Sequence, residues 1–365
     1  MKKYVLTVVL TVMSIFLCAF TASAETKTYT LSLEEAISMA MEDNPQFTSA
    51  QTKIKDAEKQ LAEAKKDQKN VKGVIRLPEG LQLAAVKKGY YVEQAKFGVE
   101  SAKLEKIQAE SKLSYEVTQK YYTLKLAQLL YASANDSYQL MLENKNNMDT
   151  QFSLGLVSQM DVNNANYAVM QAENMVNTYQ RNLGIAKKNL MISLQIEDED
   201  ANFVLTDGIE FEEFTADLNS DAQKAMESRY DLYALKSMYE ISGKYLDVTM
   251  LLGMKSSEYS AANQAMVQNE YTYNNTKKLI GLSINVSYNE ILNAKDALKL
   301  AETGLSLREQ EYEIAKVQAE IGMITNNQLT AALNNVANAR IEYENAKLTY
   351  KLAVIKYEYE ITIGL

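Results

Sequence analysis

The chain has 365 residues, with two prolines, one cysteine, no histidine and no tryptophan, and a net charge of −9. Histidine is the usual general base and the commonest metal ligand, so hydrolytic triads and histidine-bound zinc or haem are excluded. The acidic balance argues against a nucleic-acid partner. Because proline is the strongest helix terminator, its scarcity permits very long helices.

The N-terminus predicts an export signal. Lys2 and Lys3 precede an apolar run over residues 5–20, and Ala22-Ser23-Ala24 matches a cleavage site. We therefore expect residues 1–24 to be a signal peptide. The run is shorter than the roughly 20 residues of a spanning helix, which disfavours an uncleaved anchor. The other alternative is acylation of Cys18. A lipoprotein signal has a small residue directly before its cysteine, and here that residue is Leu17, which disfavours acylation. The mature chain then has no cysteine, so packing must stabilise it.

Apolar residues recur at three- and four-residue spacings through most of the mature chain, which indicates an all-α fold. The pattern predicts helices over residues 31–43, 45–69, 79–151, 158–195, 217–252, 254–320 and 325–361. The third would be about 110 Å long, far longer than a globular helix. Ser32 and Glu35 match a capping box at the start of the first predicted helix, and Asn44-Pro45 ends that helix. The acidic segment 196–216 predicts an irregular connector with a short strand at 203–205.

The chain also shows an internal duplication. Residues 152–165 (FSLGLVSQMDVNNA) match residues 319–332 (AEIGMITNNQLTAA) at an offset of 167, with a glycine at the same place in each. A second match, Ala40-Met41-Glu42 with Ala225-Met226-Glu227, has an offset of 185. We predict a first helical-hairpin repeat at 25–195, the connector at 196–216 and a second repeat at 217–365.

Strict seven-residue rows follow each matched turn. A small-residue row and a large-residue row side by side allow two helices to approach closely, which favours a coiled coil over an ordinary amphipathic helix. The rows are Ala165, Ala172, Tyr179, Ala186 with Val169, Val176, Leu183, Leu190, and Ala332, Ala339, Ala346, Ala353 with Val336, Tyr343, Tyr350, Tyr357.

These stretches resemble a known family. Residues 31–47 (LSLEEAISMAMEDNPQF) are similar to the opening of TolC-like outer-membrane efflux proteins, and the two glycine-containing turns resemble that family's paired helix–turn–helix tips. The resemblance implies a homotrimer whose helices form a long tunnel, with the tips docked on a periplasmic adaptor of the membrane-fusion type and its pump. It also implies a cell-envelope location, in the outer membrane or periplasm, or at the cell-wall face of a host without an outer membrane.

The sequence departs from that family where membrane strands are expected. Family members insert a strand pair in each half, and each barrel strand needs about 9–11 residues. Only residues 70–78 and 251–257 stand at the corresponding places. We therefore expect a TolC-like helical body, an α-barrel in the assembly, with β-barrel strands reduced or absent. The sequence leaves contact with a membrane open.

The tips are the candidate functional residues. Glycine permits a tight reversal, Ser158 and Thr325 can cap the next helices, and the apolar residues beside them suit docking on an adaptor. The ten tip residues are Leu154, Gly155, Leu156, Val157, Ser158, Ile321, Gly322, Met323, Ile324 and Thr325. Asp161, with Gln328 as its counterpart, is a candidate pore constriction, and the alternative for Asp161 is an ordinary first-turn acid.

The sequence indicates no catalytic, cofactor or metal site, so we do not expect an enzyme. The acidic run at 197–200 lacks the spacing of a calcium loop. The leading hypothesis is a passive exit duct or docking component of an efflux or export system. The alternative is a secreted helical scaffold of the cell envelope with no conduit of its own.

Overall fold

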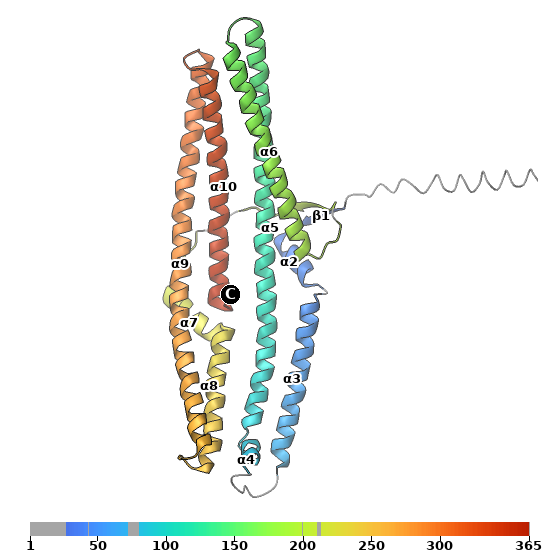
Figure 1. Ribbon diagram of the computed structural model, residues 1–365, viewed down its shortest axis with the longest axis vertical. Helices are drawn as coiled ribbons and strands as arrows, with labels where there is room; N and C mark the ends of the chain where they lie inside the picture. The colour runs from blue at the N-terminus through green and yellow to red at the C-terminus, as the bar shows by residue number, and fades with distance from the viewer. Residues whose placement is uncertain (1–26, 43, 72–79, 199, 210–212, 365) are drawn as a thin grey trace, which may run out of the picture.

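The computed structural model describes residues 27–42, 44–71, 80–198, 200–209 and 213–364. Figure 1 shows a long, slender helical molecule. The elements are β1 (Thr28–Leu31), α2 (Leu33–Met41), α3 (Pro45–Asn70), α4 (Leu81–Lys87), α5 (Tyr90–Ser153), α6 (Gln159–Ser193), β2 (Asn202–Leu205), α7 (Leu218–Ser228), α8 (Tyr230–Thr249), the 3-10 turn η1 (Met250–Leu252), α9 (Ser257–Glu320) and α10 (Asn326–Thr362). The all-α prediction is confirmed.

Two helices, α5 and α9, run the length of the molecule (Figure 1). Each has 64 residues, which corresponds to about 96 Å. In the lower half of the view α3 packs on α5 and α8 packs on α9, whereas in the upper half α6 packs on α5 and α10 packs on α9. The short helices α2 and α7 lie near the middle.

The duplication extends to the helix boundaries. Under the offset of 167, helices α5 and α9 begin and end at equivalent residues. Helices α6 and α10 also begin at equivalent residues. Under the offset of 185, α2 and α7 share their starts, and α3 and α8 do too. The two halves therefore repeat the same succession of short helix, hairpin and turn.

Two predicted helices are each divided in the structure. The helix expected at 79–151 breaks at Gly89, whose φ of 76° lies in the left-handed region. The helix expected at 217–252 breaks at Arg229, whose ψ of 130° is extended. Neither break has a proline, so the sequence carries no strong helix terminator at these positions.

A small parallel sheet joins the start of the first repeat to the connector that follows it. Strand β1 pairs with β2 from Thr28↔Asn202 to Leu31↔Leu205. The strand predicted at 203–205 is confirmed, whereas β1 was missed because Leu31 was assigned to the first helix. The ring of Tyr29 stacks on Phe203 at 5.6 Å between centroids.

The core consists of helix seams. All sixteen residues of the predicted heptad rows are buried or half-buried. One apolar cluster joins α2, the sheet, α5 and α6, and a second joins α7, α9 and α10. Tyr121 is fully buried in the first cluster, and Tyr350 and Tyr357 are almost fully buried in the second.

Some predictions fall partly or wholly outside the described residues. The signal peptide at 1–24 does so entirely, and the segment at 70–78 does so from residue 72 onward. The segment at 251–257 is described, and it forms the end of η1 and a turn at Gly253 before α9 begins. None of the described helices combines the length and apolar character that a membrane span requires.

Candidate functional site

The two predicted tips lie at the same end of the molecule, at the top of Figure 1. Gly155 and Gly322 adopt nearly the same left-handed conformation, with φ of 73° and 74°. After each glycine the next amide reaches back to the preceding helix, from Leu156 to the carbonyl of Gln151 at 2.9 Å and from Met323 to that of Gln318 at 2.8 Å. Both turns therefore have the glycine-terminated ending common at helix C-termini.

A capping box begins each following helix. The hydroxyl of Ser158 accepts from the amide of Asp161 at 3.3 Å, and the amide of Ser158 donates to the Asp161 carboxylate at 2.9 Å. Thr325 and Gln328 make the same two bonds at 3.4 and 2.8 Å. These side chains satisfy amides that the first helical turn leaves without partners.

Four apolar tip side chains point into solvent. Leu154 and Leu156 are 68% and 71% exposed, and their counterparts Ile321 and Met323 are 64% and 71% exposed. In contrast, Val157 packs against the buried cluster around Met148. Because the outward side chains contribute nothing to the local core, they are available to a partner.

Asp161 and Gln328, the candidate constriction, occupy equivalent positions in the two caps. Hydrogen bonds from the Ser158 hydroxyl and amide hold the pKa of the Asp161 carboxyl below its usual range. Asp161 is therefore anionic near neutral pH, whereas Gln328 makes the same cap without a charge. Both side chains are already engaged in the turn, so any role in a pore would be added to this structural one.

An apolar seam on the outer side of α9, broken at one position, was not predicted from the sequence. Its members stand at multiples of seven residues and are 49–76% exposed, and Asn293 is the polar interruption. They are Leu279, Val286, Leu300, Leu307, Ile314 and Ile321. The heptad spacing was present in the sequence, but only the structure shows that no described helix covers this row.

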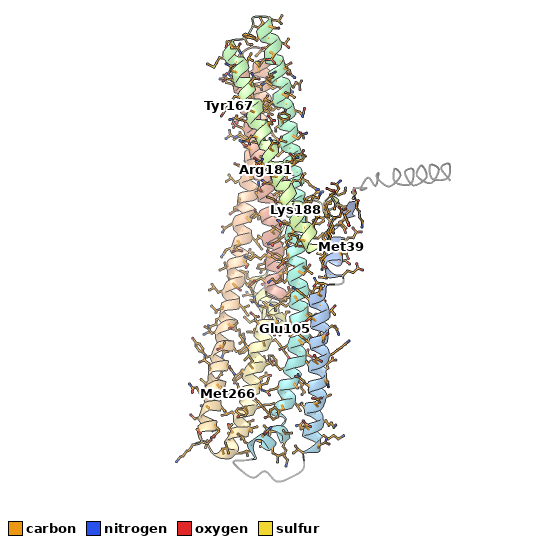
Figure 2. The ribbon with its side chains drawn as sticks, turned by 45° about the vertical axis from the view of Figure 1, so that its right-hand side comes forward. Met39, Glu105, Tyr167, Arg181, Lys188 and Met266 are labelled. Atoms are coloured by element: carbon orange, nitrogen blue, oxygen red, sulfur yellow. The ribbon has the colours of Figure 1, made fainter. Side chains whose placement is uncertain are left out.

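Helix α6 has a second exposed apolar face. It comprises Met160, Tyr167, Met170, Ile185 and Ile192, which are 61–73% exposed. A helical turn of 100° per residue places all five within one side of α6. Tyr167 lies along this helix near the tips (Figure 2). In Figure 1 α9 forms one lateral edge of the upper half, whereas α6 starts between α10 and α5 at the tips, crosses α5 and reaches the other edge toward the middle of the molecule.

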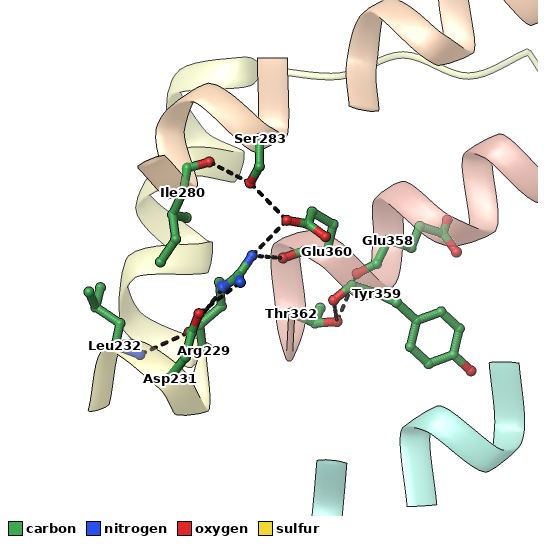
Figure 3. Close-up of polar contacts among 9 residues, drawn as sticks. All are labelled: Arg229, Asp231, Leu232, Ile280, Ser283, Glu358, Tyr359, Glu360 and Thr362. Atoms are coloured by element: carbon green, nitrogen blue, oxygen red, sulfur yellow. Dashed lines mark hydrogen bonds and ion pairs between the residues drawn. The ribbon is translucent and has the colours of Figure 1, made fainter. Parts of the chain in front are cut away.

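A buried ionic cluster lies where α7 meets α8 (Figure 3). The Arg229 guanidinium contacts the Glu360 carboxylate at 2.7 Å and makes two bonds to Asp231, at 3.1 and 2.9 Å. Ser283 on α9 donates to the same Glu360 oxygen at 2.8 Å. The cluster therefore connects α8, α9 and α10. Arg229 and Glu360 are 131 positions apart, so no local sequence pattern predicts their contact.

Comparison with known proteins gives one family match and a consistent fold. The sequence profile of the outer membrane efflux protein family matches residues 250–356. No curated protein sequence matches at a significant level.

Solved structures match nearly the whole chain. The Campylobacter jejuni CmeC outer membrane channel has a TM-score of 0.68 at 14% identity, covering 90% of this chain and 85% of that one. A membrane protein from Pseudomonas aeruginosa has a TM-score of 0.72 at 14% identity, covering 91% and 90%. The Vibrio cholerae outer membrane protein VceC has a TM-score of 0.68 at 13% identity, covering 89% and 95%. At these identities the likeness establishes the fold, which is the TolC-like helical body that the sequence predicted.

Proposed function

We propose that this chain, which has the fold of outer-membrane channels and an efflux-family signature over residues 250–356, is an exit duct of an envelope efflux or export system. The duct is passive, and it assembles from three copies in the cell envelope. Its tips contact an adaptor of the membrane-fusion type, which connects the duct to a pump.

The apolar seam on α9 is the observation that supports this assembly best. A row of exposed apolar residues at seven-residue spacing is a coiled-coil seam without its partner helix. The seam of one copy packs on the exposed face of α6 on the next copy, because the two faces belong to different hairpins and no described helix of the same copy covers either of them. Such head-to-tail contacts close into a ring when the rotation between copies permits it.

The tips support the docking part of the proposal. They stand together at one end, at the limit of both hairpins, and their exposed leucine, isoleucine and methionine side chains have no local packing role. Helical tips of a partner could interleave with these side chains and remove them from water.

The assembly is tested by placing charges in the seam. We expect the wild-type mature chain to be a trimer by light scattering coupled to size exclusion, and Leu300→Glu with Leu307→Glu to be monomeric. Ser306→Glu, which adds a charge to α9 outside the seam, is the control and should keep the trimer. Circular dichroism should show unchanged helicity in all three. A wild-type monomer at high micromolar concentration would contradict the tube.

The docking role is tested with Leu156→Asp and Met323→Asp in the producing cell. We expect loss of efflux and loss of cross-linking to the adaptor, while the trimer persists. Met238→Asp, an exposed apolar side chain on α8 far from the tips, is the matched control. Unchanged efflux and adaptor contact in the tip variant would show that the tips are not the docking surface.

A further inference from the structure

The end of the molecule opposite the tips differs from the rest in charge. We define this basic end as described residues 64–71, 80–96 and 244–262, which lie at the bottom of Figure 1. It contains eight lysines and four carboxylates, in a chain whose net charge is −9. Positive charge is therefore concentrated at one end of an acidic molecule.

Most of these lysines are not neutralised within the described part of this end. Glu93 pairs with Lys96 at 3.0 Å and with Lys244 at 3.4 Å. By contrast, five exposed lysines make no ion pair with any described carboxylate. They are Lys65, Lys66, Lys69, Lys87 and Lys255. Their charge is available to an external anion.

Exposed apolar side chains stand beside this charge. Met254 is 70% exposed, Met250 is 49% exposed and Leu251 is 39% exposed, all in the turn between α8 and α9. Lys255 follows Met254 directly. The combination of flexible apolar side chains with neighbouring lysines is typical of segments that lie in the interface of a membrane.

The turn between α8 and α9 follows a helix end that is fixed by packing and by a hydrogen bond. Val248, just before it, is fully buried against Ala84 and Ala85 of α4. The Lys88 ammonium group donates to the backbone carbonyl of Asp247 at 2.7 Å, which fixes the end of α8 to the end of α4. The exposed methionines are therefore presented at a fixed place and do not belong to the core below them.

We infer that the basic end binds the surface of an anionic lipid membrane, with Met250, Leu251 and Met254 inserted at headgroup depth and the lysines on lipid phosphates. The lysines alone would suit any polyanion, but the apolar side chains gain free energy only in an apolar phase. The inference is independent of the duct. It places the tips about 96 Å from the lipid, because α5 runs between the two ends.

Vesicle binding by the full mature chain tests the electrostatic part. We expect flotation with vesicles of phosphatidylglycerol and phosphatidylcholine in equal amounts, and little with phosphatidylcholine alone. Lys65→Gln, Lys69→Gln and Lys255→Gln together should weaken partitioning on the order of 100-fold, since each basic residue at such a surface contributes about 1 kcal/mol. The control removes three exposed lysines from the part of the molecule that carries the tips and should retain binding. Its substitutions are Lys188→Gln, Lys299→Gln and Lys316→Gln. Equal losses in both variants would overturn the inference.

The absence of tryptophan supplies a probe for the apolar part. With Met254→Trp as the single tryptophan, fluorescence should move to shorter wavelength on addition of the anionic vesicles. Leu156→Trp at the first tip should keep the emission of a water-exposed indole. No shift at position 254 would show that the turn does not insert and would overturn the inference. Tight binding to soluble polyphosphate with no preference for vesicles would overturn it in favour of an anionic polymer.

Discussion

Single residues set the geometry of the tips. Glycine occupies both reversals because the left-handed backbone costs a residue with a Cβ atom about 1–2 kcal/mol. At Gly155 the structure leaves open space where a Cβ atom would stand, so the cost of a side chain there comes from the backbone conformation alone.

Replacing Gly155 with alanine should therefore lower the free energy of unfolding by about 1 kcal/mol. Gly98, inside α5 and also with open space around its Cβ position, is the matched control. Gly98→Ala should raise stability by a similar amount, since alanine is the better helix former by about 1 kcal/mol. Urea denaturation followed by circular dichroism measures both. Changes of the same sign would contradict this assignment of the turn.

Among the elements, α5 holds the β1–β2 sheet through three side chains: Lys125 and Gln128 donate to carbonyls of β2, and Tyr121 contacts β1. The Tyr121 hydroxyl donates to the carbonyl of Leu31 at 2.9 Å and accepts from the amide of Asp207 at 3.1 Å. The Asp207 carboxylate in turn accepts from the amide of Leu33 at 2.9 Å. The Tyr121 hydroxyl therefore contacts both β1 and the connector segment after β2.

Tyr121→Phe should destabilise the protein by about 1–2 kcal/mol, because the Asp207 amide loses its acceptor and the Leu31 carbonyl keeps only its bonds from Thr206. Tyr122→Phe is a close control, since its ring packs edge-on against Tyr121 at 5.4 Å while its hydroxyl is not part of this network. Chemical denaturation gives the two changes in stability. Hydrogen exchange at residues 28–33 should rise only for Tyr121→Phe, and equal effects of both variants would contradict the role of the hydroxyl.

At the scale of the whole molecule, the Arg229 cluster joins the upper and lower helices of the second half. The side chains of Arg229 and Glu360 are only 10% and 11% exposed, so removing one partner leaves a poorly solvated charge. Arg229→Met should therefore cost about 3 kcal/mol, as expected for breaking a buried ion pair.

The comparison for this variant is Arg308→Met, which removes an exposed pair with Glu311. Exposed pairs contribute little, so this variant should change stability by less than about 1 kcal/mol. Thermal and urea unfolding of both variants test the prediction. If Arg308→Met were as destabilising as Arg229→Met, burial of the Arg229 cluster would not be the cause.

The features that depend on local interactions could be predicted from the printed sequence. Glycine conformation, capping side chains and heptad spacing act within a few residues, so the long helices, both tips and the duplication were predictable from the printed sequence. The helix breaks at Gly89 and Arg229 were not predicted, because neither position has a proline. Contacts between distant residues, such as β1 with β2 and Arg229 with Glu360, depend on how the helices pack and could not be predicted from local patterns. Which apolar rows stay uncovered could not be predicted either, because a heptad row looks the same in sequence whether its partner helix lies in the same chain or in another copy.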